Sequence, residues 1–410
     1  MPKMLVVREM QFLLTGDVFG FPNGRAATRY IRLVARGLLS SGCHVRVIVP
    51  NYTEYGAAPE NTEAAGVSEG IPFEYATGSP IGLRGRIGWK LGQLRARLLI
   101  PLRLWSLRAR RRSGTVVFYG RSHKWLVYYS RWCRRLNLPL IVYVVEWMLD
   151  VPGQSKDELE KAAAFYQDLC LHADGIVVIS EFLEHKFEEL ARSRGIGCPP
   201  ILRTSILCDP AEWQGIRPAS RERPYLVYCA DLNGYLHDLT FVLHAFAELA
   251  IETHDLVAVG SASPETRRAI AEQLAQLDLG DRVGLRAEFV PQDELYGLYA
   301  GASALLAPLH ADTRSLGRFP SKIADYMLSG RPVVSSAVGE VAQYLTDGET
   351  AFLAAPGSPG AFAAKIREAL TPDRGDAVGA RGKQLAASTF HYAARARALT
   401  EFVTRTRSEE

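Results

Sequence analysis

The sequence predicts an α/β protein built from two βα domains of similar size. Two observations lead to this prediction: apolar segments of strand length alternate with helical segments, and a polar, proline-containing stretch at 205–222 separates two such series. The length of 410 residues fits two or three domains. A composition of 48% hydrophobic and 22% charged residues excludes disordered, collagen-like and disulfide-scaffold chains.

The first series begins with a short apolar strand at 4–7, followed by a glycine-rich turn at 20–24 and a helix at 26–40 with apolar residues at helical spacing. Its further strands are predicted at 45–49, 115–119, 140–145 and 175–179, and its further helices at 155–172 and 181–193. Strand, turn, helix and strand in this order form the unit from which parallel sheets are built.

The second series repeats the alternation after the linker. Its strands are predicted at 225–229, 256–259, 283–289, 304–307, 332–335 and 351–353, and its helices at 238–250, 264–277, 292–301, 321–329, 358–370 and 384–405. We therefore expect a first domain over 1–215, a second over 216–385, and a C-terminal helix within 386–410 that packs back on the first domain.

Cysteine spacing and hydropathy limit the compartment. The six cysteines are scattered and form no C-x-x-C pair, which indicates neither a zinc site nor a disulfide framework. No run reaches the roughly 18 apolar residues that a membrane-spanning helix needs. We expect a cytoplasmic protein that touches a membrane without crossing it.

Charge is distributed unevenly along the chain. Residues 75–145 contain fifteen Lys and Arg and no Asp or Glu, so the net charge of +4 is the result of +15 in this window and −11 elsewhere. Within it, 82–112 interleaves basic residues with Leu and Trp, and two amphipathic helices broken at Pro101 would suit the interface of an anionic membrane. The residues predicted to touch the membrane are Trp89, Lys90, Trp105, Arg108, Arg110, Arg111 and Arg112.

Two other interpretations of 82–112 stay open. The segment could be a helix pair that packs its leucines on the first domain and keeps its arginines in water. Nucleic-acid binding would also combine Arg with aromatic residues, although no RNA- or DNA-binding motif is present.

The segment 310–350 carries the most informative chemistry. Pro320 and Ser321 suit a helix start with Ser321 as the N-cap, and free N–H groups at a helix start favour a phosphate. Lys322 adds a positive charge there, with Arg314 and Arg318 in the preceding loop, while Asp325 could accept both hydroxyls of a ribose. Alternatively, this is a plain helix start with a solvated lysine and a surface aspartate.

The stretch 318–334, RFPSKIADYMLSGRPVV, resembles the donor-binding signature of retaining GT-B glycosyltransferases of the group 1, or family-4, class. The segments 338–348, 283–308 and 20–50 fit the same pattern, so the resemblance covers nearly the whole chain and is similar to a branch that builds surface polysaccharides. It implies two Rossmann-like domains facing a central cleft, and retaining transfer of a sugar from a UDP- or GDP-linked donor without a metal cofactor. No D-x-D motif of the metal-dependent kind is present.

The resemblance places further donor-binding residues at Asn233 and Gly234, on the loop after the first strand of the second domain. That loop departs from the family pattern, because Asp231 and His237 replace an Arg and a Lys, and Gly317 replaces the first of two glutamates. A non-catalytic, glycosyltransferase-like subunit that binds a nucleotide or a partner enzyme is therefore the alternative function. A sugar-nucleotide epimerase of the same fold would not need the basic segment.

In the first domain, Asn23 and Gly24 could bring backbone N–H groups to a diphosphate or acceptor, or form a plain turn. Glu146 ends a predicted apolar strand, at the sheet edge where ligands of α/β proteins bind, and could act on an acceptor hydroxyl or pair with an arginine. His123 is the second catalytic candidate, with a structural or solvated loop histidine as the alternative. The expected acceptor is a glycan or a lipid-linked molecule at the inner face of the cell membrane, and no nucleic-acid partner is expected.

Overall fold

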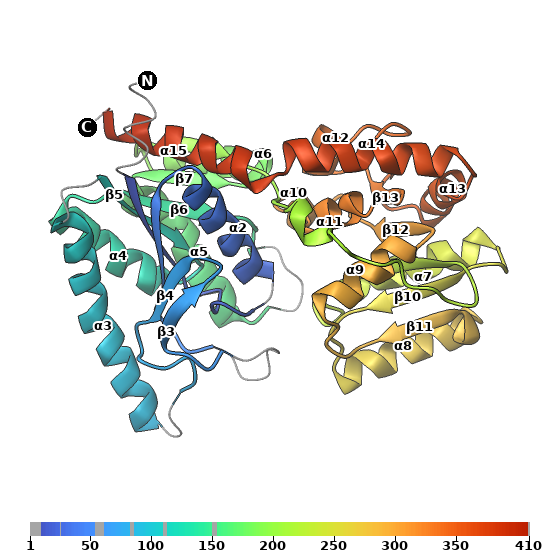
Figure 1. The fold of residues 1–410 in the computed structure, drawn as a ribbon, viewed down its shortest axis with the longest axis horizontal. Helices are drawn as coiled ribbons and strands as arrows, with labels where there is room; N and C mark the ends of the chain where they lie inside the picture. The colour runs from blue at the N-terminus through green and yellow to red at the C-terminus, as the bar shows by residue number, and fades with distance from the viewer. Residues whose placement is uncertain are drawn as a thin grey trace. The chain divides into compact units, whose positions relative to one another are not determined.

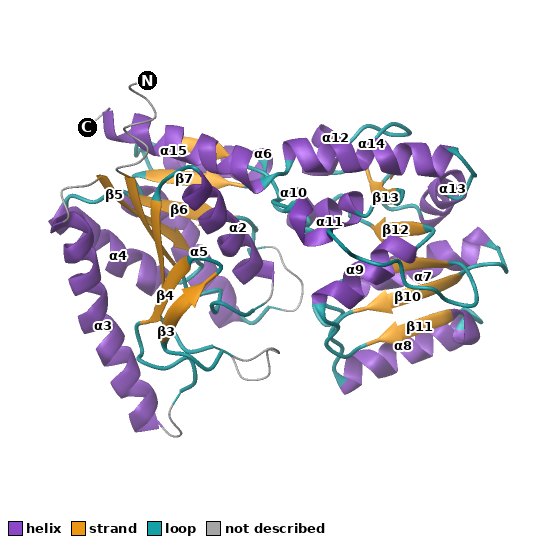
Figure 2. Cartoon of the chain, viewed as in Figure 1, coloured by secondary structure: helices purple, strands orange, loops and turns teal. Residues whose placement is uncertain are grey.

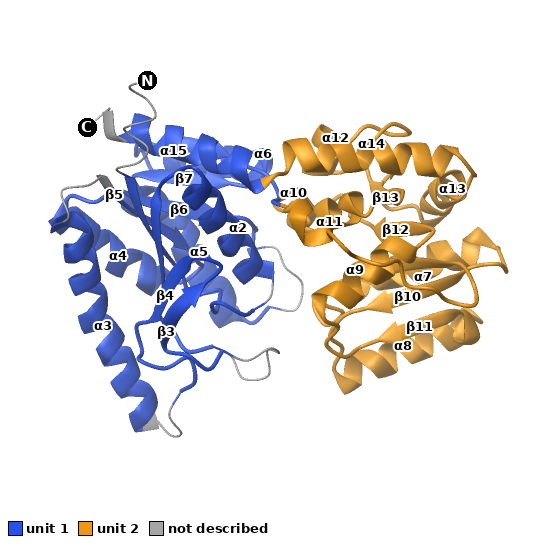
Figure 3. Cartoon of the chain, in the orientation of Figure 1, with its two compact units in different colours: residues 1–207, 392–410 blue, residues 208–391 orange. Residues whose placement is uncertain are grey.

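The structure is a computed structural model that describes residues 10–24, 26–53, 61–82, 86–109, 113–149 and 154–408. The chain divides into unit 1, residues 1–207 with 392–410, and unit 2, residues 208–391 (Figure 3). The expected boundary at 215/216 thus falls at 207/208, and the C-terminal return begins at 392 instead of 386.

Unit 1 contains a sheet in the order β3-β4-β2-β1-β5-β6-β7-β8 (Figure 1). All neighbouring strands are parallel except β3 and β4, which form an antiparallel pair. The strands are β1 (Met10–Thr15), β2 (His44–Val49), β3 (Ala65–Ser68), β4 (Ile71–Tyr75), β5 (Ser113–Tyr119), β6 (Leu140–Val144), β7 (Gly175–Val178) and β8 (Ile201–Arg203). The helices are α2 (Ala26–Ser40), α3 (Arg86–Ala109), α4 (His123–Leu136), α5 (Lys156–His172), α6 (Glu181–Ser193) and α15 (Tyr392–Ser408).

Unit 2 contains an all-parallel sheet in the order β11-β10-β9-β12-β13-β14 (Figure 2). The strands are β9 (Tyr225–Cys229), β10 (Asp255–Val259), β11 (Val283–Arg286), β12 (Ala304–Ala307), β13 (Val333–Ser336) and β14 (Phe352–Ala354). The helices are α7 (Leu236–Leu249), α8 (Pro264–Gln276), α9 (Gln292–Gly301), α10 (Thr313–Leu316), α11 (Lys322–Leu328), α12 (Gly339–Tyr344), α13 (Pro359–Ala369) and α14 (Arg374–Thr389), with 3₁₀ turns at Pro210–Trp213 and Gly280–Arg282.

The strand order fixes where a ligand can bind in each unit. In sequence order along the sheet, unit 2 has the doubly wound arrangement 3-2-1-4-5-6, and the parallel strands of unit 1 follow the same order with one more strand at the end. The order reverses between β9 and β12 in unit 2 and between β1 and β5 in unit 1. Ligands of such sheets bind at the carboxyl ends of the strands beside this reversal.

Each sheet is buried by its own apolar cluster. In unit 1, Phe12 and Leu14 of β1 pack with residues of α2 and α15, including Leu33 and Phe402, so the C-terminal helix belongs to the core of unit 1. In unit 2, Phe246 of α7 and residues of α13 cover β9 and β12 in a separate cluster. Among the described residues, no helix has the length and hydrophobicity needed to cross a bilayer.

Several predicted elements differ from the observed ones. The strand predicted at 4–7 lies outside the described residues, and β1 begins at Met10. The segment predicted as two helices broken at Pro101 is the single helix α3, and the helix predicted at 384–405 is divided between α14 and α15 around Phe390 and His391. The β3–β4 hairpin, β8 and α4 were not predicted. The strands among them are short and carry a weak hydrophobic period, whereas α4 has a clear helical period, with Leu126, Tyr129 and Cys133 buried on one face, that the sequence analysis missed.

Candidate functional site

The reversal point of unit 2 brings together two loops that are some eighty residues apart in sequence. Tyr235 follows β9, and Arg314 and Arg318 follow β12. The guanidinium carbons of both arginines lie over the Tyr235 ring, at 4.2 and 4.5 Å from its centroid. Arg314 Nη1 also donates a hydrogen bond to the Gly234 carbonyl oxygen at 3.0 Å. Two of the predicted donor-binding cations therefore share one aromatic platform at the ligand-binding edge of the sheet.

Arg318 has a buried acidic partner that the sequence analysis did not find. Its Nη2 lies 3.2 Å from Asp238 Oδ2, and its side chain is only 11% exposed. His310 Nε2 lies 3.3 Å from the other carboxylate oxygen. Burial alone would raise the pKa of Asp238, but the hydrogen bond from His310 and the charge of Arg318 outweigh it and lower that pKa. The positive charge of Arg318 is thus partly neutralised within the protein.

The β9 loop is held by hydrogen bonds to the start of α8. Asn233 Oδ1 accepts from the Ser263 backbone N–H and from the Thr266 hydroxyl, both at 2.8 Å. Asp231 Oδ1 accepts from the Ser261 hydroxyl at 2.7 Å. A Cβ added to Gly234 would meet nothing closer than 3.6 Å, the distance of an ordinary van der Waals contact, so a side chain would fit there without a clash. The structure gives Asn233 a positioning role within unit 2.

The start of α11 differs from the prediction in one respect. Ser321 already has helical dihedrals (φ −57°, ψ −27°), and its side chain makes no capping hydrogen bond. An N-cap residue is normally extended, which is why its side chain can reach the N–H groups of the first turn. The predicted capping role of Ser321 is therefore wrong. Lys322 is half-buried, and within the described part of the chain it has neither an ion-pair nor a hydrogen-bond partner.

Asp325 lies one turn into α11 and is only 8% exposed. The Tyr296 hydroxyl lies 3.3 Å from Asp325 Oδ1 and 3.0 Å from Glu212 Oε2, so one phenol stands between two carboxylates. Trp213 stacks on the Tyr296 ring with centroids 4.3 Å apart. The sequence analysis missed Glu212 and Tyr296, because they come from the linker and α9, which a linear motif does not connect.

In unit 1, the glycine-rich turn is fixed by Asn61, which is buried. The Asn23 backbone N–H donates to Asn61 Oδ1 at 2.9 Å, and Asn61 Nδ2 donates to the Asn23 carbonyl at 2.8 Å. A Cβ at Gly24 would meet Thr28 Oγ1 at 2.1 Å, so only glycine fits there. The structure thus explains Asn23 and Gly24 as parts of a tight turn beside β1.

Glu146 lies two residues beyond the end of β6 rather than at its last position. Its side chain is 44% exposed, and its Oε2 is 3.8 Å from Nη1 of Arg121, so both of its predicted environments, solvent and an arginine, are present. The next residue, Trp147, is buried and stacks on Tyr166, whose hydroxyl donates to the Glu146 carbonyl. This anchoring holds the Glu146 backbone while its carboxylate stays accessible.

A second carboxylate at the same edge was missed from sequence. Asp17, just after β1, accepts hydrogen bonds from the backbone N–H groups of Arg121 and Ser122 at 2.9 and 3.3 Å. Burial raises the pKa of Asp17, although these hydrogen bonds and the Arg121 charge partly oppose the shift. Asp17 therefore fixes the β5–α4 turn that presents Arg121 to Glu146.

His123 does not lie in a loop. It is the first residue of α4, and its Nε2 lies 2.9 Å from Asp168 Oδ2 on α5. The two predicted catalytic residues of unit 1 thus have different surroundings: an exposed arginine for Glu146 and a helix-borne carboxylate for His123.

The residues predicted to touch a membrane belong mainly to α3. Trp89 and Trp105 are 54% and 62% exposed, and Lys90 and Arg108 are exposed as well. Arg110, Arg111 and Arg112 lie outside the described residues.

Known proteins resemble this chain both around this site and over nearly its whole length. Residues 223–372 match the family model "Glycosyl transferases group 1". The chain carries a group 1 glycosyltransferase domain. That domain contains the Tyr235–Arg314–Arg318 cluster, Lys322 and Asp325, and so includes every donor-binding residue predicted in unit 2.

Solved structures match nearly the whole chain. A sucrose-phosphate synthase from Thermosynechococcus elongatus superposes with a TM-score of 0.71 at 16% identity, covering 98% of this chain and 100% of the other. HepE from Anabaena, solved with UDP and glucose, gives 0.70 at 16% identity with coverage of 96% and 99%. An α,α-trehalose-phosphate synthase (UDP-forming) from Burkholderia vietnamiensis gives 0.68 at 12% identity with 98% of each chain covered. None of the curated protein sequences matches significantly. These likenesses confirm the predicted GT-B fold.

Proposed function

We propose that the protein is a glycosyltransferase that takes a sugar from a UDP- or GDP-linked donor. The observation that carries the proposal is the coincidence of the group 1 match at 223–372 with a cationic cluster at the reversal point of the unit 2 sheet. The similar structure of HepE was solved with UDP and glucose, and another with UDP-glucose, which supports a nucleotide-sugar donor.

Within this proposal each unit 2 residue has a chemical task. Lys322, half-buried and without a protein partner among the described residues, supplies the positive charge that stabilises the leaving diphosphate. Arg314, stacked on Tyr235, adds a second charge. Asp325 is held by Tyr296 and accepts the ribose hydroxyls of the donor. These groups would support retaining transfer without a metal cofactor at the diphosphate.

In unit 1 we assign the acceptor side to Glu146. Its accessible carboxylate, anchored through the neighbouring backbone, suits a group that orients an acceptor hydroxyl or receives its proton. Arg121 lies beside this carboxylate, with its Nη1 3.8 Å from Oε2.

We further propose that the acceptor is a glycan or lipid-linked molecule presented by an anionic membrane surface, at its cytoplasmic face. The support is an exposed apolar stripe on α3, made of Ile87, Leu91, Leu94, Leu98, Leu102 and Trp105, each at least 55% exposed. These residues follow one another at intervals of three or four, so they lie on one side of the helix.

The opposite side of α3 is apolar too and already packed. Ala96, Ile100, Leu104 and Leu107 are buried, and Arg103 pairs with Glu74 through two hydrogen bonds of 2.8 and 3.0 Å. An apolar face of a helix is normally covered, and α3 has two such faces. The packed-pair interpretation accounts for only one of these sides, where Leu104 and Leu107 are the buried leucines, and it leaves the exposed leucines unexplained.

Charge complementarity supports a bilayer as the cover for the stripe. By helical phase, Lys90, Arg97 and Arg108 follow one edge of the stripe, where they would meet lipid headgroups. Trp89, although exposed, falls on another side of the helix and is not part of the stripe. The stripe and its basic edge fit an anionic interface better than a nucleic acid, which offers no apolar surface of this length.

Calorimetric titration with UDP- and GDP-sugars tests the donor site. Lys322→Ala and Asp325→Ala should each weaken binding of the donor that the wild-type chain recognises. Lys383→Ala and Asp281→Ala, at exposed positions of unit 2, serve as matched controls and should bind it normally. Equal affinities in all four variants would show that the site is elsewhere. Donor binding without turnover or donor hydrolysis would favour the non-catalytic alternative.

A further inference from the structure

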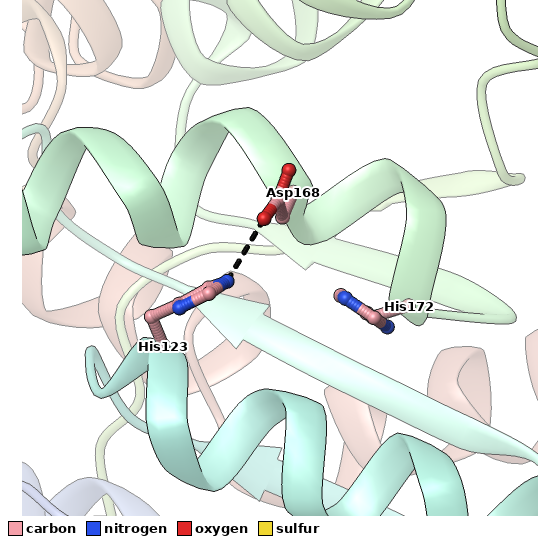
Figure 4. Close-up of side chains that lie close together, drawn as sticks. All are labelled: His123, Asp168 and His172. Carbon is pink, nitrogen blue, oxygen red and sulfur yellow. Dashed lines mark hydrogen bonds and ion pairs between the residues drawn. The ribbon is translucent and has the colours of Figure 1, made fainter.

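The facing ends of α4 and α5 bring two histidines and one aspartate together. His123 is the first residue of α4, and Asp168 and His172 lie one turn apart near the end of α5 (Figure 4). Residues four apart on a helix project from the same face, and α4 packs against α5. The three side chains therefore converge from two helices onto one point.

Their distances are close to those of a metal site. His123 Nε2 and Asp168 Oδ2 are 2.9 Å apart, and one ligand atom from each of the three residues lies within 4.8 Å of the others. Zinc bonds of about 2.0–2.1 Å in a tetrahedral arrangement place ligand atoms about 3.3 Å apart. Small rotations of the half-buried side chains would bring the ligand atoms from within 4.8 Å of one another to the separation of about 3.3 Å that zinc requires.

Neighbouring groups already orient two of these side chains. The Ser130 hydroxyl lies 3.2 Å from His172 Nδ1, which leaves Nε2 as the nitrogen for an ion. Arg194 Nη1 donates to Asp168 Oδ1 at 2.9 Å, which leaves Oδ2 facing His123. Metal-binding histidines and carboxylates typically have such partners on their other polar atom.

Charges around the cluster decide which ion would suit it. Arg194 and Arg134 oppose a cation that relies on charge alone, as Mg²⁺ and Ca²⁺ do with several carboxylates. Two imidazoles and one carboxylate favour zinc.

We propose that His123, Asp168 and His172 bind a zinc ion that joins α4 to α5, with water as the fourth ligand. This assigns His123 a metal-binding role in place of the predicted catalytic one. All three ligands belong to unit 1, so the ion would stabilise that unit.

The test uses the full-length protein stripped with a chelator. Zinc binding is measured by competition with a chromophoric chelator, and cobalt is used as a spectroscopic substitute whose absorption reports the ligand set. We expect one high-affinity ion per chain, and at least a ten-fold loss of affinity for His172→Ala and Asp168→Asn. Ser130→Ala, which keeps every ligand, should lose about ten- to hundred-fold. His185→Ala, an exposed histidine on α6, is the matched control and should bind as the wild type.

Two further measurements distinguish loss of the zinc site from loss of the fold. Far-UV circular dichroism and nucleotide-sugar binding show whether a variant is folded, and chelation should lower the melting temperature of the wild type while donor affinity stays unchanged. The proposal is overturned by sub-stoichiometric binding, by equal zinc affinity in His172→Ala and wild type, or by cobalt spectra without a tetrahedral site. A loss of donor binding on chelation would contradict the separation of this site from the proposed transfer reaction.

Discussion

Replacing the three central leucines of the α3 stripe tests the membrane proposal most directly. Leu94, Leu98 and Leu102 are 55%, 64% and 62% exposed, so changing all three to Gln removes little of the packing that the fold of unit 1 uses. The neighbouring Ile100 and Leu104, which hold α3 on the domain, are fully buried and stay unchanged. The triple variant should fold like the wild type and bind vesicles less well.

The size of the effect follows from exposure. Complete burial of a leucine side chain is worth about 1.5–3 kcal/mol, so the six-tenths that is exposed contributes about 1–2 kcal/mol on entering a bilayer. For three leucines this amounts to about 3–5 kcal/mol, or roughly a 100- to 5,000-fold loss of vesicle affinity. Changing Lys90, Arg97 and Arg108 to Gln should cost about 1 kcal/mol per charge on anionic lipid, or roughly 150-fold in all.

Vesicle flotation separates the two contributions. On pure phosphatidylcholine, the leucine variant should lose affinity while the charge variant should not; on equal parts phosphatidylcholine and phosphatidylglycerol, both should lose it. Only the charge contribution should fall with added salt. A control that changes Arg217, Arg268 and Lys383 of unit 2 to Gln removes the same charge and should bind normally. The reasoning is refuted if the wild type binds neither vesicle, or if both α3 variants bind as the wild type does.

The remaining predictions concern the two sheet edges. Tyr296→Phe removes the single phenolic proton that Glu212, at 3.0 Å, and the buried Asp325, at 3.3 Å, share, so the free energy of unfolding in urea should fall by about 1–3 kcal/mol and donor affinity should fall with it; no change in either would disprove the role of this phenol. Asp17→Asn keeps an oxygen that can accept from Arg121 and Ser122 but removes a charge whose pKa is raised by burial. Because the pKa of Asp17 is higher in the folded state, the wild type loses stability as the pH rises from the pKa of the unfolded state through that of the folded state. The Asn variant should therefore gain stability relative to the wild type between a pH of about 4 and neutrality. A constant difference in the free energy of unfolding in urea across that range would contradict the assignment. Glu146→Gln should reduce turnover more than donor affinity, and an unchanged turnover number would remove Glu146 from the acceptor side.

How much the sequence could predict is clear from particular elements. The strands predicted at 225–229 and 304–307 have the same bounds as β9 and β12, because a buried parallel strand is a continuous apolar run between turn residues. The alternation of these runs with helical segments also indicated two α/β units. In contrast, the two strands of the hairpin β3–β4 are short, have little apolar periodicity of their own and depend on neighbours for burial. The helix α4 could have been predicted, because Leu126, Tyr129 and Cys133 recur at helical spacing.

The sequence by itself determined the kind of fold, the unequal distribution of charge and the donor-binding signature, because each is encoded locally in residue type and spacing. Only the tertiary structure decided which partners the polar groups have. Arg318 meets Asp238 across eighty residues, and His123 meets Asp168 across forty-five, because the strand order brings distant loops and helix ends together. Likewise, α3 has apolar residues on opposite sides, and periodicity cannot say which side packs. Contact with unit 1 buried Ile100 and Leu104 and left Leu98 and Trp105 exposed.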